Sequence, residues 1–338
     1  MRTSFVLQRP FLLNIVLVIF ALLLSIAFGS VFIPPTELMR TIFGQGALSQ
    51  TSATIVYDIR LPNAILVALT GAALAGSGAA YQGLFRNPLA DPYLIGVASG
   101  AGLGAVFIMG RNWPSSQIGF YAVPAAAFAG ALITVALVYS IARIGKTTPV
   151  TTLILAGVAV SSFATALSTF FMLYSQSELR RAIAWLLGGA ALNGWPPVIA
   201  MLPYVAIGLG ILLFSGHQLN VLQLGEEQAQ QLGLRVERVK ALLIVAASLA
   251  AAAAVAFSGM IGFIGLIVPH TLRLIWGGDH RRLLPLSMLG GASVLLVADL
   301  LARKVFSPEV LPVGILTALA GVPFFLWLLR SAKAQMYW

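Results

Sequence analysis

The sequence predicts an all-α polytopic membrane protein with about ten transmembrane helices. Of its 338 residues, 59% belong to the hydrophobic set and only 9% are charged, against roughly 25% charged residues in soluble domains. The apolar residues form continuous runs near the length that an α-helix needs to cross a bilayer, such as residues 11–28. A transmembrane β-barrel would instead show short segments of alternating polarity. The expected fold is therefore a helical bundle in the lipid bilayer.

Ten apolar runs follow one another along the chain, separated by proline, glycine and charged residues. They span residues 11–33, 62–84, 95–110, 119–143, 150–174, 195–215, 239–257, 263–276, 282–303 and 311–331. The run 263–276 is short and lies close behind the run before it, so one long helix in their place, and a total of nine, is the alternative. No stretch is left for a soluble domain, and residues 1–338 are expected to form a single transmembrane domain.

The basic residues indicate which side of the membrane each loop faces, because cationic loops resist translocation. With the N-terminus inside, thirteen of the twenty Lys and Arg lie on the inner side and seven on the outer side. An even number of helices then places both termini in the cytoplasm. The net charge of +10 is scattered over short loops and forms no run with interleaved aromatic residues, so no nucleic acid is expected as a partner.

Two segments between the runs are too polar to span the membrane. The inner segment 216–240 carries three glutamates and three basic residues, with leucines near helical spacing around them. It predicts one or two short interfacial helices. The outer segment 175–194 contains two adjacent arginines followed by the apolar stretch 182–187, which predicts a short surface or re-entrant helix.

No constellation in the sequence is typical of an enzyme, so no catalytic residue and no metal ligand is assigned. The chain has no cysteine, and its three histidines have no neighbours at metal-ligand spacing. Residues 145–148 (Gly-Lys-Thr-Thr) resemble the end of a phosphate-binding loop, but Ser140 stands where the leading glycine belongs and no strand precedes it. A nucleotide site in this chain is therefore not expected.

One acidic residue lies firmly inside a predicted span. This residue is Asp299, four positions before Arg303, a spacing that allows an ion pair within one helix. Carriers driven by protons or sodium use acidic residues inside the membrane. A carrier of that kind is poorly supported here, and the energy for any transport must come from elsewhere.

Several stretches of the sequence occur in an order that is typical of one family. They are Arg-Leu-Pro at 60–62, Gly-Ala-Ala-Leu-Ala at 71–75, Asn-Pro-Leu-Ala-Asp-Pro at 87–92, Gly-Phe-Ile-Gly-Leu-Ile-Val-Pro-His at 262–270, His-Arg-Arg-Leu-Leu-Pro at 280–285, Ala-Asp-Leu-Leu-Ala-Arg at 298–303 and Leu-Pro-Val-Gly at 311–314. Together they resemble the FecCD-type permeases, the membrane subunits of type II ABC importers for iron chelates, haem and cobalamin. The resemblance covers essentially the whole chain and implies the ten-helix bundle of the cobalamin permease.

The resemblance implies a permease subunit in the bacterial inner membrane. Such a subunit pairs with a second permease copy, expected here as a homodimer, with two cytoplasmic ATPase subunits and with a periplasmic substrate-binding protein. ATP and Mg are then bound by the ATPase, and this subunit has no cofactor and no enzymatic step. The expected substrate is an iron chelate, haem or a ferric siderophore, with cobalamin less favoured. A self-contained secondary carrier or channel is the alternative, for which an inverted repeat would be a mark.

The resemblance also assigns residues that couple transport to the ATPase, within the inner segment 216–240. These are Leu224, Gly225, Glu226, Glu227, Ala229, Leu232 and Gly233. The length, charge and inner position of the segment are what an interface with a soluble partner requires.

Two further groups of residues are implied by the same resemblance. Docking of the binding protein falls on Arg60 and Arg303, although Asn63 and Val310 replace an arginine and a glutamate that relatives often carry nearby. The cytoplasmic gate falls on Asn87, Leu89, Val150 and Thr151, with Pro149 and Val150 in place of small hydroxyl residues.

Overall fold

The chain folds into a bundle of helices. The computed structural model describes residues 9–29, 31, 33–34, 36–38, 49–110, 117–174, 179–189, 194–305 and 311–336. Within these residues there is no strand, and the β pairing is limited to an isolated bridge between Ile144 and Thr147.

The ten predicted runs each correspond to a helix in the described part of the chain. The helices are α1 (Pro10–Ala27), α4 (Leu61–Leu84), α5 (Val97–Met109), α6 (Gln117–Ala142), α7 (Val150–Tyr174), α9 (Trp195–Phe214), α12 (Val236–Ser258), α13 (Ile264–Trp276), α14 (His280–Val305) and α15 (Val313–Met336). Seven spans are long and apolar enough to cross a membrane, and α5, α13 and α15 contribute shorter apolar stretches. Because α12 and α13 are separate helices, the alternative of nine helices is wrong.

The helix around the predicted run 62–84 begins earlier than the sequence suggested. It starts with α3 (Gln50–Thr54), continues through the π-helical turn η1 (Ile55–Arg60) and joins α4 without interruption. Pro62 has no backbone N–H, and a π-helical turn is a local distortion that accommodates such a residue inside a helix. The charges of Asp58 and Arg60 make this segment look like a loop in the sequence.

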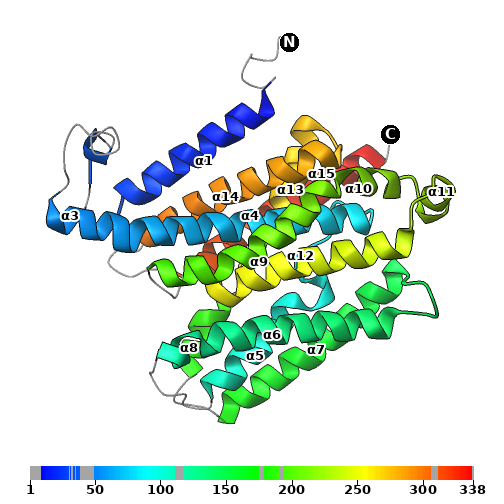
Figure 1. Ribbon diagram of the computed structural model, residues 1–338, viewed down its shortest axis with the longest axis horizontal. Helices are drawn as coiled ribbons and strands as arrows, with labels where there is room; N and C mark the ends of the chain where they lie inside the picture. The colour runs from blue at the N-terminus through cyan, green and yellow to red at the C-terminus, as the bar shows by residue number, and fades with distance from the viewer. Residues whose placement is uncertain are drawn as a thin grey trace.

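Two central helices, α4 and α12, organise the bundle (Figure 1). Helices α14, α13 and α1 pack on one side of this pair, α5, α6 and α7 form a group on the other side, and α9 lies against both α4 and α12. Most residues of α4, α12 and α14 are buried, whereas only 22% of the residues in the apolar windows of α1 and α7 are buried. The outer helices therefore present apolar faces to lipid or to a partner, and the central pair forms the core.

Glycines allow the closest helix contact in this core. A Cβ atom at Gly71 in α4 would overlap the carbonyl group of Gly291 in α14, and a Cβ atom at Gly291 would overlap the carbonyl of Gly71. Backbone carbonyls cannot move aside without moving the whole helix. The absence of both side chains thus sets the distance between α4 and α14.

The polar segments form the short helices that the sequence predicted. The inner segment contains α10 (Gly216–Leu222) and α11 (Glu226–Gln231), and the outer segment contains α8 (Leu179–Leu186). A 3₁₀ helix, η2 (Pro92–Ile95), precedes α5. Helices α10 and α11 lie at one end of the bundle and α3 and α8 at the opposite end, which agrees with the predicted sidedness (Figure 1).

Candidate coupling, gating and docking sites

The inner segment 216–240 is attached to the bundle through α10. The Asn220 side chain accepts a hydrogen bond from the His280 backbone N–H (2.8 Å) and donates one to Asp279 Oδ1 (2.6 Å). These bonds fix α10 to the start of α14. The hydrogen bond from Asn220, together with one from the Arg281 backbone N–H, holds the pKa of Asp279 below its ordinary value.

The link between α10 and α11 contacts the end of α4. Gln223 Nε2 donates a hydrogen bond of 2.7 Å to the carbonyl oxygen of Gly83, in the last turn of α4. The carbonyls of a last helical turn have no partner within the helix. The inner segment 216–240 thus caps the C-terminal end of α4, from which the first predicted gate loop emerges.

Two glycines set the ends of α11. Gly225 precedes the helix with φ of 112° and Gly233 follows it with φ of 84°, in a region that favours glycine. Beyond Gly233, the Leu234 N–H bonds to the carbonyl of Ala229 (3.0 Å), which closes the helix in the manner of a Schellman motif. The backbone conformation therefore explains why both of these positions in the predicted coupling set are glycine.

One face of α11 and its flanks is buried, and the other is open. The side chain of Ala229 is fully buried, whereas Leu224 and Leu232 are 55% and 65% exposed and Glu227 is exposed. Two exposed leucines beside polar residues form the kind of surface that a protein partner covers. The structure thus brings the predicted coupling residues together on one protruding element.

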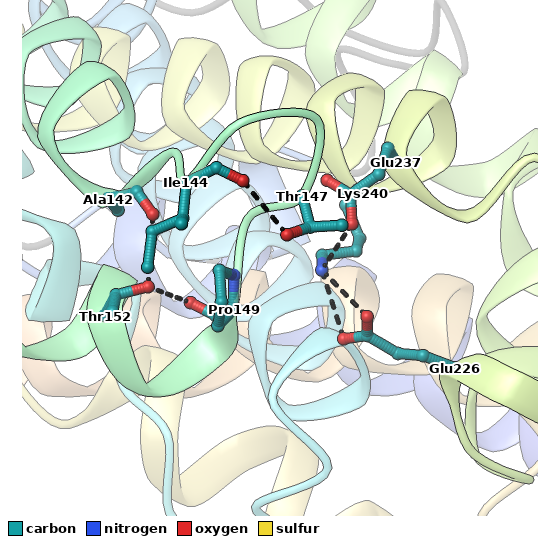
Figure 2. A network of polar contacts seen from close by, with 8 residues as sticks. All are labelled: Ala142, Ile144, Thr147, Pro149, Thr152, Glu226, Glu237 and Lys240. Atoms are coloured by element: carbon teal, nitrogen blue, oxygen red, sulfur yellow. Dashed lines mark hydrogen bonds and ion pairs between the residues drawn. The ribbon is translucent and has the colours of Figure 1, made fainter.

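A buried ion cluster holds the start of α11 against α12. Lys240 Nζ lies 3.1 Å from both carboxylate oxygens of Glu226 and 3.0 Å from Glu237 Oε1 (Figure 2). The Lys240 side chain is only 1% exposed, whereas the two glutamates keep 35% and 27%. Glu226 therefore faces inward as a partner of α12 and is not a freely exposed surface charge.

The first predicted gate loop follows α4 directly. Asn87 is exposed and its Oδ1 accepts a hydrogen bond from the Leu89 backbone N–H (3.0 Å), which stabilises the turn. Leu89 is half-buried. Arg86, just before, has φ of 50°, which marks a sharp change of chain direction at the end of the helix.

The second predicted gate loop joins α6 to α7. Ile144 and Thr147 exchange two backbone hydrogen bonds (2.9 and 3.1 Å), so this loop is a closed turn. The Thr147 hydroxyl also donates to the Ile144 carbonyl (3.2 Å; Figure 2). Val150 is half-buried at the start of α7, and Thr151 is exposed. Because η2 packs against α7, the segment after the first gate loop and the helix after the second are in contact.

Arg60, predicted to dock the binding protein, is buried in this structure with 6% exposure. Its Nη1 donates hydrogen bonds to the carbonyls of Ile26 (2.7 Å) and Ala27 (3.2 Å), and its Nη2 donates to Val31. The guanidinium thus satisfies carbonyls at and just beyond the C-terminal end of α1. It stabilises that end of α1 whether or not it also acts in docking.

Arg303 forms the predicted ion pair with Asp299. Nη2 of Arg303 lies 2.8 Å from Asp299 Oδ2, and the same nitrogen donates to Ser25 Oγ (2.8 Å). The Arg303 side chain keeps 20% exposure. The pair therefore neutralises the carboxylate of Asp299, and Arg303 also binds α1. Val310, where relatives often carry a glutamate, lies outside the described residues.

The comparison with known proteins identifies the family. Residues 17–331 match the model of the FecCD transport family. This chain belongs to that family. It is 48% identical to the cobalamin import system permease protein BtuC of Halobacterium salinarum over 291 residues, which cover 86% of this chain and 77% of the relative. It is 37% identical to the hemin transport system permease protein HmuU of Yersinia pestis over 321 residues, 93% and 94% of the two chains.

A solved structure supports the same assignment. An inward-facing conformation of a metal-chelate type ABC transporter superposes with a TM-score of 0.82 at 30% identity, over 96% of this chain and 99% of that chain. The predicted fold, a polytopic helical bundle like that of the FecCD permeases, is confirmed. The coupling, gating and docking roles of individual residues stay predictions.

Two residues of this FecCD permease that sequence reasoning left without a role are Lys240 and Gln223. In the sequence, Lys240 contributes to the positive charge of the inner side. It also lies inside the apolar run 239–257, three residues after Glu237. A lysine at the edge of an apolar run, next to an acidic residue, is a signal for a buried ion pair. Nothing in the sequence indicates the bond from Gln223 to Gly83, because the two residues are far apart in the chain.

Proposed function

We propose that this chain is the membrane-spanning permease of an ATP-driven importer, which moves a bulky metal chelate from the periplasm to the cytoplasm across the bacterial inner membrane. The observation that carries the proposal is the match of nearly the whole chain to the FecCD transport family, whose relatives include permeases named for cobalamin and hemin. The permease itself performs no covalent chemistry, and a separate subunit hydrolyses ATP.

The surface of α11 supports coupling to two cytoplasmic ATPase subunits, one for each permease copy. Leu224 and Leu232 offer apolar anchors, and the exposed Glu227 lies between them in the chain. Burial of an exposed leucine against a partner stabilises an interface by about 1.5–3 kcal/mol. The face lies at the end of the bundle opposite to α3 and α8, so an ATPase bound there would not obstruct a binding protein at the other end.

The exposed face of α7 supports pairing with a second permease copy in a homodimer. Leu155, Phe163 and Leu173 are 64%, 65% and 70% exposed along this helix. A second copy or lipid tails would cover them equally well in chemical terms. Between two copies, such a face would form an apolar pathway wall along which a large rigid substrate slides without tight binding.

The binding protein is proposed to dock at the end that carries Arg60 and Arg303. Arg303 keeps exposure for a carboxylate of the partner, while Arg60 already donates to carbonyls and would act through its positive charge. Charge-assisted contacts of this type suit reversible capture.

The substrate class is a metal chelate, with cobalamin and an iron chelate as the two candidates. The range of substrates in the family favours haem or a ferric siderophore, whereas the relative that is 48% identical is named for cobalamin. These compounds share a large rigid framework around a bound metal. The metal is cargo, and no residue of this chain is proposed to coordinate it as a cofactor.

The test is uptake by proteoliposomes that contain this chain with its ATPase and binding protein, with ATP on the ATPase side. Haem, a ferric siderophore and cobalamin are compared, and a parallel sample lacks the ATPase. We expect one compound to accumulate only when ATP and ATPase are both present. Equal uptake without the ATPase would overturn the proposal and establish a secondary carrier or channel.

A further inference from the structure

Lys240 has a charged side chain to which the proposed function assigns no role. It is 1% exposed at the start of α12, and its ammonium group contacts three carboxylate oxygens at 3.0 to 3.1 Å (Figure 2). A buried ammonium is costly unless it is paired and hydrogen-bonded. The geometry around Lys240 meets that requirement in full, since all three ammonium donors have an acceptor.

The two glutamates of this cluster differ in where they come from. Glu237 lies on α12 itself, three residues before Lys240, so this pair joins a helix to itself. Glu226 is the first residue of α11, and both of its carboxylate oxygens lie 3.1 Å from the ammonium. Within the part of the chain that the structure describes, the Lys240–Glu226 pair is the salt bridge that joins α11 to another helix.

Helix α12 continues from this cluster into the core of the bundle. Polar side chains of α4 bind it along its length: Ser77 Oγ donates to the carbonyl of Ala247 (2.9 Å), and the hydroxyls of Tyr81 and Ser248 lie 2.7 Å apart. Hydrogen bonds between helices within a membrane act in addition to packing and hold the pair in register. These bonds form a path through which a displacement of the start of α12 would reach α4.

The end of α4 carries the predicted gate loop with Asn87 and Leu89. The coupling segment reaches this end directly as well, through the bond from Gln223 to the Gly83 carbonyl. A motion of α11 thus has two connections to the gate loop, one through Lys240 and α12 and one through Gln223. The first connection carries a charge pair and the second a neutral hydrogen bond, so the first is expected to be the stronger.

We propose that Lys240 is a positioning residue that couples ATP hydrolysis to transport, because its ion pair with Glu226 makes α11 move together with α12. This inference rests on the proposed function of the chain as a permease with an ATPase at α11. Without the pair, the ATPase would still bind the exposed face of α11 and hydrolyse ATP. The movement of α11 would then no longer be passed on in full to the core.

The experiment measures ATP hydrolysis and substrate uptake in the same proteoliposomes and reports uptake per ATP. Glu226→Ala removes the partner on α11, and Glu237→Gln is the matched control, since it removes a charge from Lys240 without cutting the link between helices. We expect Glu226→Ala to lower uptake per ATP by about fivefold or more, within the usual range of coupling between sites. Glu237→Gln should stay within about twofold of the wild type, a difference too small to count as coupling.

A second readout does not depend on transport and reveals a variant that fails to fold. The chain has no cysteine, so spin labels at Gln230→Cys in α11 and Arg238→Cys in α12, both exposed positions, report one distance without background. We expect the distance distribution to widen with Glu226→Ala and to stay narrow with Glu237→Gln.

Three results would overturn the inference while the proposed function stands. Uptake per ATP at the wild-type level in Glu226→Ala would show that Lys240 has no coupling role, and so would a parallel loss of hydrolysis and uptake with an unchanged ratio. Unchanged distance distributions in both variants would show that the pair does not hold α11. If wild-type vesicles show no ATP-dependent uptake at all, the proposed function fails, and the coupling inference fails with it.

Discussion

Tyr93 and Ile261 exchange two hydrogen bonds across the bundle. The Tyr93 hydroxyl donates to the carbonyl of Ile261 (2.9 Å) and accepts from its N–H (3.3 Å). Tyr93 lies in η2, behind the predicted gate loop, and Ile261 lies between α12 and α13, where its side chain is 3% exposed. One hydroxyl thus satisfies both backbone groups of a buried residue that belongs to no helix.

Tyr93→Phe is expected to destabilise the protein by about 1–3 kcal/mol, because it leaves a buried N–H and a buried carbonyl without a partner while the ring stays in place. The midpoint of thermal unfolding in detergent measures the effect. Tyr204→Phe is the control, since the Tyr204 side chain is 41% exposed and should tolerate the loss of its hydroxyl. Equal midpoints for Tyr93→Phe and the wild type would refute the role of this bond.

Gly71→Ala is expected to separate α4 from α14. The new methyl group would lie 2.7 Å from the carbonyl carbon of Gly291 and 2.9 Å from Leu295 Cβ, so the backbone of one helix has to move. Overpacking of this kind costs about 1–3 kcal/mol. Gly210→Ala in α9 has no atom within 4 Å of the new methyl group and should be neutral or slightly stabilising. The two variants are compared by thermal unfolding, and equal midpoints would contradict the close contact.

The positions of the spanning helices could be predicted from the sequence because hydropathy and length alone define them. The run 150–174 coincides with α7, and the other runs differ from their helices by at most five residues at either end, except that the run 11–33 extends six residues beyond α1. The helical start before Pro62 cannot be predicted from the sequence because the polar contacts of Arg60 are tertiary. Arg60 fits inside the bundle because three carbonyls at and just beyond the end of α1 accept hydrogen bonds from it, and no local sequence pattern shows that.

The candidate site was predictable only where its residues form one segment. The coupling residues of α11 are consecutive, so the resemblance located them together. Lys240 is fourteen residues from Glu226, and the two residues lie on different helices, since α11 ends at Gln231 and α12 begins at Val236, so periodicity within one element does not pair them. The partner of a buried charge is set by how α11 folds back on α12, and this depends on the left-handed turns at Gly225 and Gly233 rather than on spacing.

The stability of the protein is expected to fall in acid partly through Asp279. The hydrogen bonds from Asn220 and the Arg281 backbone lower the pKa of this carboxylate from its ordinary value of 3.8. A lowered pKa in the folded state means that the stabilisation is present above about pH 4 and is lost as the pH falls through the folded-state pKa. Because Asp279 is exposed, solvent weakens the effect.

Asp279→Asn keeps an oxygen acceptor and removes the titration. The wild type should therefore unfold at a higher temperature than the variant near neutral pH, and this difference should shrink between about pH 5 and about pH 3. The measurement is the unfolding midpoint of both proteins across this range. A difference that stays constant with pH would show that the charge of Asp279 does not contribute.

Leu232→Glu is expected to weaken binding of the ATPase. The leucine is 65% exposed and lies just behind α11, so a glutamate there leaves the fold intact and places a charge where the partner would bury an apolar anchor. Losing the burial of this side chain costs about 2 kcal/mol, which corresponds to about a thirtyfold weaker Kd. Leu232→Met keeps the apolar contact and should bind like the wild type. The measurement is the Kd between the detergent-solubilised permease and the purified ATPase. The same affinity for Leu232→Glu and Leu232→Met would mean that this leucine faces water in the assembled transporter, and that the ATPase binds elsewhere on the inner end of the bundle.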